Sequence, residues 1–388
     1  MMDVIKNVFR TNIRQYGMIV ALVLITLLFQ FLSDGILLKP LNVTNLIQQN
    51  SYILVLAIGM VMVIITGHID LSVGSVAAFV GALSAIMMVD YGMPFYAATV
   101  LSLLIGAAVG AWQGFWVAYV RIPSFIVTLA GMLLFRGLTM IVLNGQSIAP
   151  FPKAFQKIST GFLPDFGSNS VHMLTIVVGV ALSLVTIVQE LRSRRTQQKY
   201  GFDVLPMPWF VLKLAVMAAV INIFTFVLAR YKGIPFILIL LFALVAVYTF
   251  VMKRTVMGRH VYAIGGNEKA AKLSGVKTKK VTFWVFVNMG ALAALSGLIY
   301  AARLNAATPK AGVNFELDAI AAAFIGGASA SGGIGTVIGA IIGGLVMGVM
   351  NNGMSLIGLG IDWQQGIKGL VLLLAVSFDI YNKNKSGA

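Results

Sequence analysis

Long apolar runs separated by short polar stretches make up most of this chain of 388 residues. A helix that crosses a bilayer core needs about 20 apolar residues, with a range of about 17–25. Runs near this length recur along the whole chain, and they are continuous rather than alternating, which favours helices over strands. The pattern predicts twelve membrane-entering segments, at roughly 16–33, 51–67, 71–90, 95–119, 123–143, 171–189, 208–229, 235–252, 281–302, 316–330, 335–352 and 363–380.

The predicted fold class is therefore an all-α polytopic membrane protein, with residues 1–388 forming a single transmembrane domain. An even number of segments places both termini on one side. The segment at 316–330 is short and contains paired glycines, so it either spans the membrane or enters and returns on the same side.

The longest strongly polar interruption is the stretch 253–280. It holds one acidic residue, Glu268, against eight basic ones: Lys253, Arg254, Arg259, Lys269, Lys272, Lys277, Lys279 and Lys280. Lys and Arg collect on the cytoplasmic side of membrane helices. The stretch is predicted to be a cytoplasmic loop between two spans, and both termini, which are also basic, are predicted to be cytoplasmic.

Within this loop the sequence predicts a short helix. Gly265-Gly266 is expected to interrupt the chain, and the side chain of Asn267 can cap the helix that follows. Glu268 then occupies the first turn, where the helix dipole favours a negative charge, and Gly275 supplies a stop. Such a helix either docks onto a cytosolic partner or lies on the lipid headgroups.

Composition supports the membrane class. The chain is 59% hydrophobic and 10% charged, with a mean hydropathy of +0.94, whereas soluble domains are about 25% charged. The net charge of +16 does not indicate nucleic acid, because nineteen of the 28 Lys and Arg fall at the predicted inner face. Anionic lipid headgroups of the bilayer are the natural counter-charge. The absence of cysteine excludes disulfides and thiolate chemistry.

No catalytic constellation is present. The chain has no GxxxxGK[ST], HExxH or GxSxG motif, and its three histidines are far apart in sequence. We therefore expect no catalytic residue and no metal site, and no cofactor bound by this chain.

Three blocks carry a family resemblance: Gly258-Arg259 with AIGGNEKAAKLSGV (263–276), TGHIDLSVGS (66–75) and ELDAIAAAFIGGASASGGIG (316–335). They resemble, in the same order, blocks of the permease subunits of bacterial ABC importers for ribose, arabinose, galactose and xylose. The resemblance implies that the loop 253–280 couples the permease to an ATPase. The residues it implies for that contact are Gly258, Arg259, Gly265, Gly266, Asn267, Glu268, Ala270, Ala271, Ser274 and Gly275.

The resemblance also implies the assembly. Two permease copies would form one pathway, with a cytoplasmic ATP-binding subunit that holds ATP and Mg²⁺ and a periplasmic sugar-binding protein, in the bacterial inner membrane. Residues 171–229 look like a span pair inserted into a ten-segment core, as in the xylose and multiple-sugar branch, so xylose is the first choice of substrate. Alternatives are an ABC permease for another small polar solute and a stand-alone secondary transporter.

Two further sets of residues are candidates for packing and transport. Glycines spaced by four clear a helix face for close approach, either within one chain or at a dimer seam or pore: Gly335, Gly339, Gly343, Gly344 and Gly348. Polar side chains that can exchange hydrogen bonds with a sugar are candidates for its path: Gln48, Gln49, Asn50, Asp70, Ser72, Asn351, Asn352 and Gln364. Asp70 can instead cap the helix expected from Leu71, and Lys368 can extend towards the outer surface.

Overall fold

Helices form nearly all the regular structure of the computed structural model, which describes residues 13–166, 171–202 and 204–386. In the described residues the only β pairing consists of two isolated bridges, Ile148 with Ala307 and Phe162 with Pro235. The helices are α2 (Ile13–Leu32), α3 (Pro40–Ile65), α4 (Val73–Ala85), η1 (Ile86–Asp90), α5 (Phe95–Phe115), η2 (Trp116–Val120), α6 (Ser124–Val142), α7 (Lys153–Thr160), α8 (Met173–Lys199), α9 (Met207–Ala229), α10 (Phe236–Arg254), α11 (Val256–Gly266), α12 (Glu268–Leu273), α13 (Thr278–Leu304), α14 (Phe315–Ile325), α15 (Val337–Leu356) and α16 (Ile361–Ser386).

Nine of the helices in the described part of the chain are long and apolar enough to cross a membrane. They are Pro40–Ile65, Val73–Asp90, Phe95–Val120, Ser124–Val142, Met173–Lys199, Met207–Ala229, Phe236–Arg254, Thr278–Leu304 and Val337–Leu356. The other three predicted segments fall on α2, whose apolar part is Gly17–Leu32, on α14 and on α16. The chain is thus a multi-pass α-helical membrane protein, with fewer full-length spans than the twelve predicted segments.

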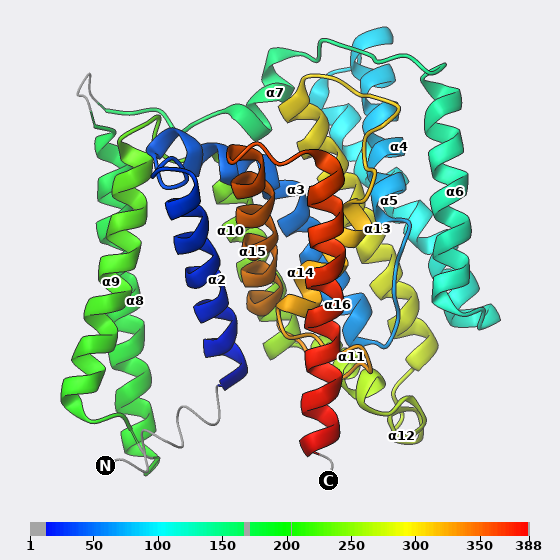
Figure 1. Cartoon of the computed structure of the whole chain (residues 1–388). Helices are drawn as coiled ribbons and strands as arrows, with labels where there is room; N and C mark the ends of the chain where they lie inside the picture. The colour runs from blue at the N-terminus through cyan, green and yellow to red at the C-terminus, as the bar shows by residue number, and fades with distance from the viewer. Residues whose placement is uncertain (1–12, 167–170, 203, 387–388) are drawn as a thin grey trace.

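Helix α3 runs through the centre of the molecule (Figure 1) and is buried along almost its whole apolar length. Helices α10, α13, α14 and α15 pack around it. A helix that is apolar on all sides is suited to this position, because every face meets another helix. The outer helices α5, α6, α8, α9 and α10 instead expose many large apolar side chains, as expected where lipid covers them.

Two of the crossings are interrupted. Helix α4 with η1 is 18 residues long, whereas the neighbouring α5 with η2 is 26. The non-helical segment 66–72 connects α3 to α4 in the first crossing, and the segment 305–314 descends to the start of α14 in the second (Figure 1). At 11 residues α14 is about 16 Å long, roughly half of a bilayer core.

The two interrupted crossings touch at glycines. A Cβ on Gly74 would collide with the Gly312 carbonyl oxygen, and one on Gly312 would collide with the Gly74 carbonyl oxygen. The turn-rich segment 305–314 therefore packs directly on the start of α4, and non-helical backbone in a membrane is tolerated where protein covers it in this way.

Helices α8 and α9 form a hairpin at one edge of the molecule (Figure 1). Asn222 of α9 donates to Ser183 of α8 at 2.8 Å, and Gly179 faces Thr225 closely. The hairpin occupies the segment 171–229 that the sequence singled out. Backbone hydrogen bonds from His172 to Ala229 and from Leu163 to Ile234 hold the two ends of the hairpin, and the chain that flanks them, together.

The first described residue of α2 and the last of α16 lie on the side of the molecule that carries α11 and α12 (Figure 1). The predicted positions of the termini themselves concern residues 1–12 and 387–388, which lie outside the described residues.

Candidate functional site

The predicted short helix of the polar loop is present as α12. Asn267 is its N-cap, with its side-chain oxygen accepting the Ala270 backbone N–H at 3.0 Å. Gly275 adopts a φ of +87°, the left-handed conformation expected after a helix end. The cap and the stop that the sequence predicted are confirmed.

The expected break at Gly265-Gly266 is wrong. Both glycines are the last residues of α11, and the chain turns at Asn267, where φ is −162°. The sequence did not indicate α11. A Cβ on Gly265 would collide with the Ile65 carbonyl oxygen and the Gly333 backbone nitrogen. Close packing of this helix end against other backbone thus offsets the low helix propensity of glycine.

Contacts around Gly265 join α11 to two other parts of the chain. The Gly333 N–H donates to the Ile65 carbonyl at the end of α3 at 2.8 Å. The Tyr262 hydroxyl donates to the Gly335 carbonyl at 2.7 Å. Burial raises the pKa of the Tyr262 phenol, so the hydroxyl keeps its proton and remains a donor at neutral pH.

The glycine-rich block 326–335 therefore forms a turn against α11 and the end of α3. Gly335 lies before α15, whose first residue is Val337, so it does not belong to the predicted glycine-spaced helix face. The other four glycines pack within this chain. Gly339 and Gly343 meet the end of α14, while Gly344 and Gly348 meet Leu54 and Asn50 of α3.

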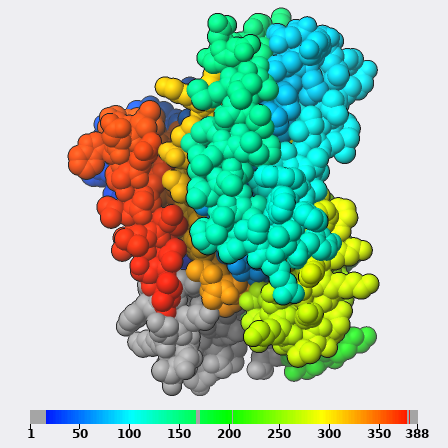
Figure 2. Space-filling view, turned by 90° about the vertical axis from the view of Figure 1, so that its right-hand side faces the viewer, coloured from blue at the N-terminus to red at the C-terminus, as the bar shows by residue number. Residues whose placement is uncertain are grey.

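The ten residues predicted to contact an ATPase separate into two groups. Gly258 and Ala271 are buried in this chain, and Gly265 packs as described above. The remaining seven are exposed: Arg259, Gly266, Asn267, Glu268, Ala270, Ser274 and Gly275. Figure 2 shows the region of α11 and α12 (yellow-green) at the lower edge of the molecule, beneath α5 and α6.

Leu273, the last residue of α12, is 90% exposed. Ala271 of the same helix faces inwards, and Leu273, two residues further on, lies on the opposite side. An exposed leucine at the tip of a polar loop suits a protein interface.

Asp70 and Ser72 are buried in the first interrupted crossing. The Asp70 carboxylate accepts the Ser72 backbone N–H at 2.8 Å and the Ser72 hydroxyl at 2.6 Å. Gln113 of α5 donates to the Ser72 hydroxyl at 2.7 Å. These bonds organise the entry into α4, which begins at Val73 and not at Leu71 as expected. Neither side chain faces an open path in this conformation.

Several of the predicted path amides are used within the fold. Asn42 and Asn352 exchange two hydrogen bonds, at 2.8 and 3.2 Å, and so join α3 to α15. Asn50 donates to the Leu46 carbonyl, and Gln364 donates to Leu359 and Ser355. Gln49 is exposed. Buried polar atoms without a partner remain on Gln48 (Nε2) and Asn351 (Oδ1).

Those two amides adjoin a cluster that the sequence did not indicate. Asp318 of α14 pairs with Lys368 of α16 at 3.0 Å and lies beside Asn351 of α15. Tyr52, one turn beyond Gln48 on α3, stacks on Phe315 with 4.0 Å between ring centroids, and Tyr300 completes the aromatic group. We name Gln48, Tyr52, Asp318, Asn351 and Lys368 the outer cluster.

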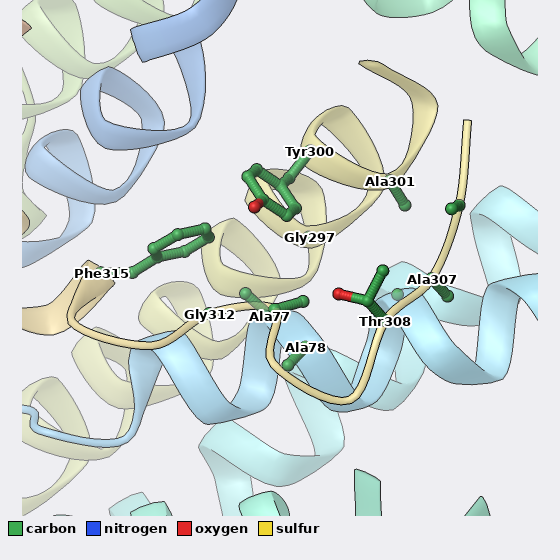
Figure 3. Close-up of a pocket in the computed structure, with 12 residues that line it drawn as sticks. Ala77, Ala78, Gly297, Tyr300, Ala301, Ala307, Thr308, Gly312 and Phe315 are labelled. Atoms are coloured by element: carbon green, nitrogen blue, oxygen red, sulfur yellow. The ribbon is translucent and has the colours of Figure 1, made fainter. Parts of the chain in front are cut away.

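A small cavity lies next to the aromatic group, between α4, α13 and the segment 305–314. Figure 3 shows Tyr300 and Thr308 among small residues such as Ala77, Gly297 and Gly312. Its volume is about 10 Å³, which is room for about one water molecule. The second interrupted crossing is therefore closely packed against α4 and α13.

We predict that replacing both Asn42 and Asn352 by leucine destabilises the protein by less than the sum of the two single replacements. The Asn352→Leu change leaves the side-chain oxygen of the buried Asn42 without its donor, which costs about 1–3 kcal/mol, while Asn42 Nδ2 keeps its bond to the Leu37 carbonyl. The Asn42→Leu, Asn352→Leu double variant removes the pair together and loses only the Leu37 bond in addition. Unfolding temperatures in detergent for the two single variants and the double variant would show this. Additive losses would contradict a coupled pair.

Comparisons with known proteins identify the family and the relatives that this chain resembles. Residues 42–376 match the family described as branched-chain amino acid transport system / permease component. The chain is 40% identical over 374 residues to the xylose transport system permease protein XylH of Haemophilus influenzae, covering 96% of this chain and 98% of that protein. It is 40% identical over 376 residues to XylH of Escherichia coli K12, covering 97% and 94%.

A more distant relative is the ribose import permease protein RbsC of Haemophilus influenzae, 34% identical over 340 residues, covering 88% of this chain and 85% of that protein. No solved structure matches the chain. With a match across most of its length and relatives aligned almost end to end, this chain belongs to the family of branched-chain amino acid transport system permease components.

Proposed function

We propose that this protein is the permease subunit of an ATP-driven importer that carries xylose across the bacterial inner membrane. The observation that carries the proposal is the 40% identity to xylose permeases over nearly the full length of both chains. The identity to the ribose permease is lower, at 34%, and covers less of the chain.

The ATP-binding subunit docks on α12 and the exposed part of α11. Binding interfaces are commonly centred on an aromatic or aliphatic anchor side chain that fills a pocket of the partner. Leu273 is suited to that role, with Glu268 and Ser274 exposed on the same short helix. ATP and Mg²⁺ bind to the partner, and this permease chain has no enzymatic activity.

Movement of α12 reaches the membrane through α11. The contacts of Gly265 with Ile65 and Gly333, and the Tyr262–Gly335 hydrogen bond, connect α11 to the end of α3 and the turn before α15. The segment 66–72, which leads into the first interrupted crossing, follows α3 directly. A displacement of α11 therefore acts on both interrupted crossings.

The sugar enters through the outer cluster. Unpartnered amide atoms of Gln48 and Asn351 supply hydrogen bonds to the hydroxyl groups of the sugar. Of the predicted path residues, only these two amides combine burial with a free polar atom. The specificity of uptake rests mainly on a periplasmic sugar-binding protein that delivers the substrate.

The assembly is a homodimer with both termini in the cytoplasm. Twelve membrane segments, ten of them in the core and two in the α8–α9 hairpin, would give this topology if α2, α14 and α16 complete the nine long spans. In Figure 1 the start of α2 and the end of α16 lie on the same side of the molecule as α11 and α12, which supports this topology.

Co-purification tests the proposal. The chain would be expressed with candidate ATP-binding and solute-binding proteins. ATPase activity would be measured with the binding protein loaded with xylose, ribose or a branched-chain amino acid, or left empty. A stable complex stimulated by the xylose-loaded protein is expected. Stimulation by a branched-chain amino acid instead would assign a different cargo, and uptake by the chain alone under an ion gradient would establish a secondary transporter.

A further inference from the structure

A cavity of about 350 Å³ lies between α11 and the start of α13, on the side of the molecule that carries the coupling loop. Two helices and the turn between them line it. The lining residues are Met257, His260, Gly275, Lys277, Lys280, Val281 and Trp284. None of them belongs to the outer cluster or to α12.

The rim of this cavity is basic. Lys277 and Lys280 lie one turn apart and are exposed, and His260 of α11 lines the same cavity. No acidic residue lines it, so the positive charge is not neutralised from within the cavity. The chemistry of the rim suits an anion with several acceptor oxygens, such as a phosphate group.

The floor of the cavity is apolar and is formed by residues at the start of a membrane-spanning helix. Val281 is 6% exposed and Trp284 is 49% exposed, and both lie on α13, which continues as a membrane span. Met257 of α11 closes the other wall. Tryptophan favours the depth of the lipid headgroups, where its ring meets acyl chains on one side. The cavity thus extends from the cytoplasmic surface to the beginning of the apolar layer.

We propose that this cavity binds the headgroup of an anionic phospholipid. The phosphate lies between Lys277 and Lys280, and the part of an acyl chain nearest the headgroup lies against Trp284 and Met257. A soluble phosphate would fill only the rim and leave the apolar floor open to water. The bound lipid would bridge α11 and α13 and so hold the base of the coupling loop at a fixed depth in the membrane. This inference depends on the membrane topology and not on which solute is carried.

Fluorescence quenching by brominated lipids tests the proposal. The complete chain would be placed in nanodiscs of phosphatidylcholine that contain a fifth of either brominated phosphatidylglycerol or brominated phosphatidylcholine. The chain has five tryptophans, so the signal of Trp284 is the difference between the natural protein and Trp284→Phe. Each lysine near the surface gives roughly a fivefold preference for an anionic lipid, so the pair predicts about a 25-fold preference at this site.

A matched variant controls for net charge. Lys277→Gln with Lys280→Gln is expected to abolish the preference, whereas Lys279→Gln, at an exposed neighbouring position outside the cavity, is expected to retain it. Equal quenching of Trp284 by the two brominated lipids in the natural protein would overturn the proposal. Loss of the preference in potassium phosphate, but not in potassium chloride of equal ionic strength, would also overturn it, because the site would then take soluble phosphate.

Discussion

Replacing Gly265 by alanine is expected to reduce sugar uptake by at least an order of magnitude and to lower the unfolding temperature. The added methyl group would collide with the Ile65 carbonyl oxygen and the Gly333 nitrogen, which are backbone atoms and cannot rotate away. Overpacking of this kind costs about 1–3 kcal/mol, and about 2 kcal/mol corresponds to roughly a 30-fold change in an equilibrium constant. The end of α11 would be forced away from the end of α3 and from the turn before α15.

The neighbouring glycine, Gly266, provides a control with the same glycine-to-alanine substitution. Gly266 is also in the last turn of α11, and a Cβ there would meet no atom within 4 Å. Gly266→Ala should keep the unfolding temperature of the natural protein. Equal unfolding temperatures and uptake rates for the natural protein and Gly265→Ala would show that the close backbone contact does not matter for coupling.

Replacing Leu273 by alanine is expected to weaken the binding of the ATP-binding subunit by roughly 30-fold while leaving the permease as stable as before. The side chain is 90% exposed, so it contributes almost nothing to the packing of this chain. A leucine buried in a partner's pocket contributes about 2 kcal/mol when it acts as a hot spot. The change also keeps good helix propensity, so α12 should remain folded.

The measurement is a titration of the permease in nanodiscs with the purified ATP-binding subunit, followed by stimulated ATPase activity. Lys272→Ala, at the adjacent exposed position of α12, is the matched control and should bind within about threefold of the natural protein. If Leu273→Ala bound as tightly as Lys272→Ala, the docking surface would have to lie elsewhere on the loop.

Local signals in the sequence were predictive where they described local structure. The cap at Asn267 and the stop at Gly275 depend only on neighbouring residues, and both are confirmed. The role of Gly265 could not be predicted, because its close neighbours Ile65 and Gly333 are distant in sequence. Gly335 fitted a four-residue spacing, yet the helix begins at Val337, since Thr336 caps it.

The outer cluster illustrates the same limit. Lys368 was predicted to extend towards the outer surface, but it forms an ion pair with Asp318 that joins α16 to α14. Fifty residues separate them in sequence. The apolar pattern placed a segment at 316–330 without fixing its form, because hydropathy does not distinguish the 11-residue α14 and its turn-rich approach from a continuous helix.

The ends of the α8–α9 hairpin bear on how such a permease can gain or lose parts. Phe162 and Pro235 form an antiparallel bridge, and the Phe236 N–H donates to the Gly161 carbonyl at 2.9 Å. The chain thus leaves and re-enters the core at one place, as in a β-hairpin whose turn has been replaced by two membrane helices. A short turn that joined Phe162 to Pro235 would close the chain at this bridge, so α8 and α9 would be gained or lost together.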